Sequence, residues 1–255
     1  MRFLAAAVLL VLVAWTVQAD EIYELDGLAE PAEIIVDRWG VPHIYAQTHY
    51  DAFLVQGFNA ARDRLWQIDL WRKRGLGLLS DAFGQQFVDQ DRANRLFLYR
   101  GDMYREWLAY GSDAKKIAES FAAGVNAYID LVDANPELLP PEFELLDYRP
   151  ARWSAADIVR IRSHGLLYNV RNEARRARIV CHAGLEASYA WKVLEPARET
   201  SIPAGLDPCV IPDDVLATYE LARSPVRFDT EGSAGILEAP EFAGSVEGSN
   251  NWVVA

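Results

Sequence analysis

The chain has 255 residues, of which 51% are hydrophobic, and its formal charge is −12. A chain of this length and composition can bury one large core or two small ones, and its eight Trp, eleven Tyr and ten Phe exclude a disordered protein. The acidic balance disfavours nucleic acid and anionic membrane surfaces as partners, because both attract basic proteins.

The N-terminus has the pattern of a secretory signal peptide over residues 1–19. Arg2 precedes an apolar run that reaches about residue 15, and Val17-Gln18-Ala19 supplies small residues before Asp20. The run is shorter than the roughly 20 residues that a membrane-spanning helix needs. The sequence therefore predicts cleavage before Asp20, export to the periplasm or the medium, and no membrane association after the leader is removed.

Export makes a disulfide between the chain's two cysteines, Cys181 and Cys209, plausible. Oxidising compartments preserve disulfides, and closing a loop of this size would stabilise the fold by roughly 3–4 kcal/mol in the chain-entropy account. The alternative is a pair of buried free thiols, and the sequence leaves that alternative open.

Hydrophobic periodicity predicts a hairpin followed by long helices. Two short β-like runs, 34–36 and 43–46, flank a turn that contains glycine. Helical periodicity follows over 51–74 and over 113–134, the second helix with Ser112 as its N-cap. The apolar stripes expected in the core are Leu54, Phe58, Ala61, Leu65 and Ile68, then Ile117, Phe121, Val125, Tyr128 and Val132.

The second half of the chain predicts more helices and then a linker. A proline-rich crossing ends at a capping-box pattern, Ser154 to Asp157, which begins a helix that continues toward residue 178. Shorter helices are expected at 185–194 and 213–222. The stretch 228–248 contains five acidic residues and no Lys or Arg, which is typical of a flexible linker.

The last residues, Trp252-Val253-Val254-Ala255, have the composition of a β-strand. A strand launched from a linker has nothing after it to pair with, so we expect more protein to follow. Several familiar catalytic signatures are missing: the sequence contains no G-x-S-x-G, P-loop, H-E-x-x-H or C-x-x-C motif.

Five segments taken together resemble the penicillin acylase family of N-terminal-nucleophile hydrolases. They lie in the order in which that family carries them and extend over residues 34–255. The segments are Val36–Ala46, Ala61–Gln67, Phe121–Tyr128, Leu139–Phe143 leading to Pro150–Ser154, and Gly248–Val254.

The resemblance implies a fold and a division of the chain. The mature family enzyme is an α+β protein with four αββα layers, and this chain would supply its largely helical α-subunit part, truncated soon after the β subunit begins. The implied boundaries are a signal peptide at 1–19, an α-subunit region at 20–223, an acidic spacer at 224–248 and the start of the β subunit at 249–255. The implied partner is the β subunit derived from the same precursor.

The resemblance also implies that Ser249 is the nucleophile after the chain cleaves itself between Gly248 and Ser249. A hydroxyl is a weak nucleophile until a base takes its proton. The freed α-amine of Ser249 would have a pKa of about 7.7–8 and could serve as that base on the same residue. Taken without the resemblance, Gly-Ser-Asn-Asn is ordinary loop composition.

Further residues follow from the resemblance. Glu173 is the candidate ligand of one structural Ca²⁺ shared with the β subunit, with an ion pair to Arg176 as the alternative. Tyr168, Asn169 and Val170 are the candidate substrate-binding residues, with ordinary core or interface packing as the alternative.

The implied activity is hydrolysis of a small linear amide, as in a penicillin amidase, through an acyl-serine intermediate. An acyl-homoserine lactone or a lipopeptide is an alternative substrate, and a non-catalytic secreted helical domain is the alternative from another functional class. Because the oxyanion donors would lie beyond Ala255, we expect residues 1–255 alone to be inactive.

Overall fold

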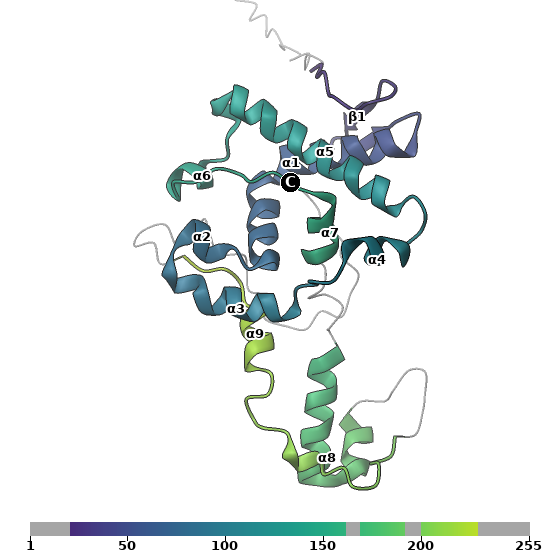
Figure 1. Cartoon of the computed structure of the whole chain (residues 1–255), viewed down its shortest axis with the longest axis vertical. Coiled ribbons are helices and arrows are strands. Elements are labelled where there is room, and N and C mark those ends of the chain that lie inside the picture. Colours follow the sequence, from purple (N-terminus) through teal and green to yellow (C-terminus); the bar gives the residue numbers. More distant parts are fainter. Residues whose placement is uncertain (1–20, 162–168, 192–199, 229–255) are drawn as a thin grey trace, which may run out of the picture.

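A two-stranded hairpin near the N-terminus leads into a body of helices, from which one helical arm projects (Figure 1). The computed structural model describes residues 21–161, 169–191 and 200–228. The predicted leader at 1–19, the predicted cleavage site at Gly248–Ser249 and Tyr168 lie outside these ranges.

The elements follow one another from the hairpin to a last short helix. In chain order they are β1 (Glu33–Val36), β2 (Pro42–Tyr45), α1 (His49–Leu76), α2 (Leu79–Phe83), η1 (Gln85–Phe87), α3 (Val88–Phe97), α4 (Met103–Leu108), α5 (Ala114–Ala134), η2 (Pro136–Leu138), α6 (Pro141–Leu145), α7 (Ala155–Ile161), α8 (Asn169–Trp191), η4 (Pro208–Val210) and α9 (Ala217–Arg223).

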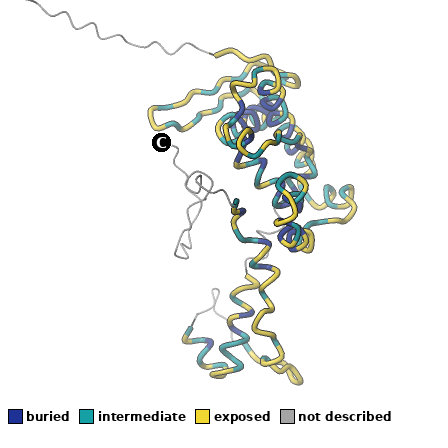
Figure 2. The backbone as a smooth tube through the Cα atoms, turned by 90° about the vertical axis from the view of Figure 1, so that its left-hand side faces the viewer, coloured by how far each residue is buried: buried dark blue, intermediate teal, exposed yellow. Residues whose placement is uncertain are grey.

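The predicted hairpin is confirmed, with β1 and β2 antiparallel and Ile34 opposite Ile44. Its turn is organised by Asp37, whose carboxylate accepts hydrogen bonds from the backbone N–H groups of Trp39 and Val41. Both strands are short and mostly exposed or half-buried, so the hairpin stands away from the core (Figure 2).

Helix α1 begins where its sequence provides a cap. The hydroxyl of Thr48 accepts a hydrogen bond from the Asp51 N–H at 3.1 Å, and Asp51 in turn accepts one from the Ala29 N–H at 2.9 Å. The Ala29 N–H, followed by the Thr48 hydroxyl, which donates to the same carboxylate at 2.8 Å, holds the pKa of Asp51 below its ordinary value. The helix ends at Gly77, whose left-handed backbone (φ 67°) lets its N–H bond back to Arg74.

The core lies between α1 and α5, which carry the predicted stripes. Leu54, Phe58, Ala61 and Leu65 are buried on α1, and Val125 and Val132 are fully buried on α5. Phe58 and Tyr128 meet edge to face with ring centres 5.4 Å apart. The periodicity of the sequence therefore predicted the main helix–helix contact of the fold.

The two core helices approach each other through glycine. A methyl group added at Gly124 would lie 1.8 Å from the carbonyl oxygen of Leu54, and one added at Gly57 would lie 2.1 Å from the carbonyl oxygen of Phe121. No side chain fits at such distances. Glycine on both helices thus sets the spacing of α1 and α5, and therefore the relative positions of the side chains on these two helices.

An aromatic cluster covers the other end of α1. The Trp66 ring meets those of Phe143 and Tyr148 at 5.6 and 5.8 Å between centres. Phe228, the last described residue, packs against Trp66 at 6.1 Å and against Phe83 at 5.0 Å. The chain therefore returns to the helical body after α9, within the range predicted to belong to the spacer.

Several local predictions differ from the structure. Helix α5 is preceded by Asp113, without a side-chain cap, so the prediction of Ser112 as its N-cap is wrong. The last helix begins at Ala217, because residues 213–216 form a turn rather than a helix. Helices α2, α3 and α4 were not predicted; all three are short, and α4 has no buried residue.

The regular elements of the described residues are helices apart from one two-stranded hairpin, which confirms the predicted largely helical α+β class. Among these residues, no helix has the length and apolar character needed to cross a membrane.

Candidate functional site

The predicted site residues of the described chain lie at the start of α8, in the arm (Figure 1). Asn169 and Val170 occupy its first turn and are exposed, and Glu173 is exposed one turn later. Their side chains lie on the surface of this chain, where a substrate or a partner chain can reach them.

The alternative explanation for Glu173, an ion pair with Arg176, does not describe the structure. Arg176 is buried, and its guanidinium donates to the hydroxyl and carbonyl oxygens of Ser188 at 3.3 and 3.4 Å. It also lies 5.6 Å from the centre of the Trp191 ring. Glu173 is not joined by two other His, Cys, Asp or Glu side chains into a metal-binding group within the described ranges.

The arm contains a disulfide bond and a bend in α8. Cys181 in α8 forms a disulfide with Cys209 in η4, which ties the helix to the returning chain. Gly184 interrupts α8 with a backbone (φ 81°, ψ 175°) outside the helical region, so that the helix turns back on itself. Arg176 spans this bend through its bonds to Ser188.

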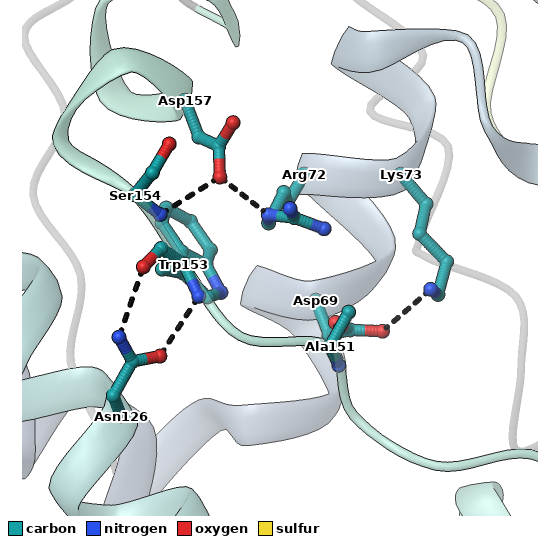
Figure 3. A network of polar contacts seen from close by, with 8 residues as sticks. All are labelled: Asp69, Arg72, Lys73, Asn126, Ala151, Trp153, Ser154 and Asp157. Atoms are coloured by element: carbon teal, nitrogen blue, oxygen red, sulfur yellow. Dashed lines mark hydrogen bonds and ion pairs between the residues drawn. The ribbon is translucent and has the colours of Figure 1, made fainter.

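Side chains of the helical body hold the segment that leads to α7 (Figure 3). Asn126 of α5 brackets Trp153: its amide nitrogen donates to the Trp153 carbonyl at 2.9 Å, and its amide oxygen accepts from the Trp153 N–H at 2.8 Å. One side chain thereby satisfies both backbone polar groups of a residue that lies outside regular structure.

Two side chains of α1 hold the same segment from the other side (Figure 3). Asp69 is fully buried and accepts a hydrogen bond from the Ala151 N–H at 3.0 Å. Arg72 donates to Asp157 at 2.9 Å, and the same carboxylate accepts from the Ser154 N–H at 2.9 Å. The latter bond is one half of the predicted capping box: the carboxylate of Asp157 accepts from the backbone N–H of Ser154 before α7.

Charge is unevenly compensated around Asp69. Its nearest cation is Lys73, with Nζ 3.7 Å from the carboxylate. Burial raises the pKa of Asp69 above its ordinary value, and Lys73 opposes this rise only in part. Burial, followed by the adjacent Asp69 carboxylate, also raises the pKa of Tyr148, so its phenol keeps its proton at all physiological pH values.

These contacts position an element and carry out no chemistry of their own. Asp69, Arg72 and Asn126 fix the backbone of residues 151–157, and α7 begins within that range. Sequence reasoning did not single out these three residues. A signal for Asp69 was available, because it is an acidic residue directly beside the apolar stripe of α1, where a charge needs a partner.

We expect replacement of Asn126 by alanine to lower the free energy of unfolding by about 2–3 kcal/mol, because both backbone groups of Trp153 lose their partner in a part-buried site. Urea denaturation of the full chain measures the change. Asn135→Ala is the matched control, since Asn135 makes a single bond, to a carbonyl at the end of its own helix, and we expect about 1 kcal/mol or less there. Equal losses at the two positions would contradict a special role for Asn126.

Comparison with known proteins identifies the class to which this arrangement belongs. The structure is similar to a solved thermostable penicillin G acylase from Alcaligenes faecalis, with a TM-score of 0.51, 27% sequence identity, and coverage of 69% of this chain and 98% of that chain. The sequence is 30% identical over 234 residues to penicillin acylase 2 proenzyme of Pseudomonas sp. strain SE83, covering 91% of this chain and 29% of the relative.

A second kind of relative is an acyl-homoserine lactone acylase. The chain is 28% identical over 246 residues to acyl-homoserine lactone acylase QuiP of Pseudomonas fluorescens strain Pf0-1, covering 92% of this chain and 28% of the relative. The chain thus spans less than a third of the length of either of these two curated relatives.

The family model for penicillin amidase matches residues 31–255. The chain belongs to the penicillin amidase family. The resemblance stated from five sequence segments is therefore confirmed over nearly the whole chain.

Proposed function

We propose that this chain is the N-terminal part of the precursor of an exported amidohydrolase, which hydrolyses a linear amide through an acyl-serine intermediate at Ser249. The observation that carries the proposal is the family match, which extends to Ala255 and so includes Gly248 and Ser249. The names of the relatives, penicillin acylase and acyl-homoserine lactone acylase, both describe cleavage of an acyl group from nitrogen.

The proposed maturation breaks the Gly248–Ser249 peptide bond. Attack of the Ser249 hydroxyl on the Gly248 carbonyl forms an ester and transfers the proton to the nitrogen, which becomes a free α-amine. Water then hydrolyses the ester and leaves Gly248 as a carboxyl terminus. Glycine suits the position before the nucleophile, because the absence of a Cβ permits close approach of the hydroxyl to the carbonyl.

The mature site then repeats this chemistry on a substrate. The neutral α-amine of Ser249 accepts the proton of its own hydroxyl, the hydroxyl oxygen attacks the acyl carbonyl, and the protonated amine product leaves. Water releases the acid from the acyl-serine. Backbone or amide donors of the β subunit, a partner from the same precursor, would stabilise the oxyanion, so we propose that residues 1–255 alone are inactive.

The arm has a place in this proposal. Asn169 and Val170, together with Tyr168, would contribute to the acyl pocket at the boundary with the β subunit, and Glu173 would give one carboxylate to a shared Ca²⁺. The exposure of the described three supports this, since a site completed by a second chain needs groups on the surface. Ca²⁺ requires six to eight oxygen ligands, so the remaining ligands would come from elsewhere.

Two substrate classes compete, and one experiment separates them. The complete gene product is allowed to mature, and its newly formed N-terminus is sequenced. Its hydrolysis of an acylated β-lactam is then compared with its hydrolysis of a fatty-acyl homoserine lactone. Residues 1–255 alone serve as the negative control. We expect an N-terminus at Ser249 and turnover of at least one amide by the matured protein only. An N-terminus elsewhere, no turnover of either amide, or turnover by residues 1–255 would each contradict the proposal.

A further inference from the structure

An open groove of about 860 Å³ lies between α3, α9 and the chain that follows α9. These parts are far apart in sequence but adjacent in space (Figure 1). Gln90 of α3 joins them by donating to the Ser224 carbonyl at 2.9 Å. The groove therefore has a wall from α3 and another from α9, and residues 224–227 run along it.

Three arginines line this groove: Arg171 from the start of α8, Arg223 from the end of α9, and Arg227 beyond it. The first two both lie close to the Tyr219 ring, with guanidinium carbons 5.8 and 5.4 Å from its centre. Arg223 also donates to the Tyr219 hydroxyl. A buried aromatic ring thus fixes the position of two of the three cations.

The charge of the groove contrasts with that of the chain. Three arginines line it against two carboxylates, Asp89 and Glu220, among the described residues, whereas the whole chain carries −12. Glu220 pairs with Arg171, and both side chains are more than 40% exposed, so the pair is weak and open to exchange. Burial is the main cause that lowers the pKa of Arg74, and the charge of nearby Arg223 lowers it further. Such crowding of cations favours an anionic occupant.

An acidic segment follows the last groove residue, Arg227, closely in the sequence. Residues 229–247 contain five carboxylates and no Lys or Arg, and they begin two positions after Arg227. Phe228 is anchored in the aromatic cluster with Phe83 and Phe87, at 5.0 and 5.6 Å between ring centres. Attachment at that point gives the segment a high effective concentration at the groove, so that individually weak ion pairs suffice to hold it.

We propose that this groove binds residues 229–247 of the same chain. The groove then acts as a docking surface for the acidic segment in the uncleaved protein, with the arginines as its ionic contacts. This inference goes beyond the proposed function, and it does not depend on Ser249 being the nucleophile.

A glutamate-specific endopeptidase tests the docking, because the segment offers cleavage after Glu231, Glu238, Glu241 and Glu247. The full chain carries Ser249→Ala, so the segment stays attached whatever happens at Gly248. The test variant is Arg223→Glu with Arg227→Glu. The matched control, Arg100→Glu with Arg105→Glu, makes the same change of charge at exposed residues near α4, away from the groove.

We expect the groove variant to be cleaved within the segment about fivefold faster than the unmodified chain, a factor typical of a few exposed ion pairs, whereas the control is unchanged. Adding Glu238→Lys and Glu241→Lys to the groove variant restores ionic complementarity with the signs exchanged. We expect this variant to regain protection, which is read at Glu231 and Glu247. Recovery also shows that the arginine changes had not simply unfolded the chain.

Three outcomes would overturn the proposal. One is equal cleavage of the unmodified chain and the groove variant. Another is failure of the exchanged-charge variant to regain protection while its circular dichroism and thermal midpoint match those of the unmodified chain. The third is protection that rises with protein concentration, because it would mean that the groove binds the segment of a second copy.

Discussion

Replacing Ser249 by alanine in the complete precursor should leave a single uncut chain, with amide hydrolysis reduced by more than about a thousandfold. The same hydroxyl is proposed to attack the Gly248 carbonyl during maturation and the substrate carbonyl afterwards. Alanine therefore removes the nucleophile of both reactions, and it also keeps the nitrogen of residue 249 in a peptide bond, where it has no free lone pair to act as a base.

Mass spectrometry of the purified protein and a continuous hydrolysis assay measure the two effects separately. Ser245→Ala is the matched control, since it removes a hydroxyl four residues earlier, and we expect normal cleavage and activity. Ser249→Cys retains a nucleophile, so we expect it to keep some cleavage. Normal processing of the Ser249→Ala precursor, or full hydrolysis by it, would rule out Ser249 as the nucleophile.

We expect Gly124→Ala to lower the free energy of unfolding by about 2–4 kcal/mol, the second large effect. The added methyl group would lie 1.8 Å from the Leu54 carbonyl oxygen, which belongs to the backbone of α1 and cannot turn aside as a side chain could. The two core helices must separate, and the contacts of Phe58 with Tyr128 weaken with them. This loss exceeds the gain in helix propensity that alanine usually brings.

Urea denaturation of the full chain measures this change. Gly111→Ala is the control, because a methyl group there meets only the Asp113 side chain at 3.4 Å, an ordinary contact. We expect a change within about 0.5 kcal/mol at that exposed position. A stable Gly124→Ala protein would mean that the helices can shift apart without cost and that glycine does not set their spacing.

The core helices and the hairpin could be predicted from the sequence, because local patterns of residues encode them. The stripes of the two long helices gave the core, because burial on one helix face repeats every three or four residues. The turn at Asp37 and Gly40 gave the hairpin. Cys181 and Cys209 could be proposed as a pair only from the compartment, and the structure joins them.

Other features depend on contacts between distant residues, which no local pattern reports. Nothing in its immediate neighbours shows that Asn126 brackets Trp153, 27 positions away. Gly57 and Gly124 read as ordinary helix-weakening residues until α1 and α5 are placed together. Helices α2 to α4 are too short to display a clear period, and the arginine groove combines three separate parts of the chain.

The bond between Cys181 and Cys209 gives the projecting arm a source of cohesion of its own. The arm packs mainly on itself, with α8 against η4, rather than on the helical body. A link that closes this 28-residue span restricts the arm even when its other contacts are lost. The disulfide therefore contributes to the stability of the arm, whereas the stability of the helical body depends on its buried apolar surface. Under reducing conditions the arm can lose its order first, while the helix pair beneath it stays intact.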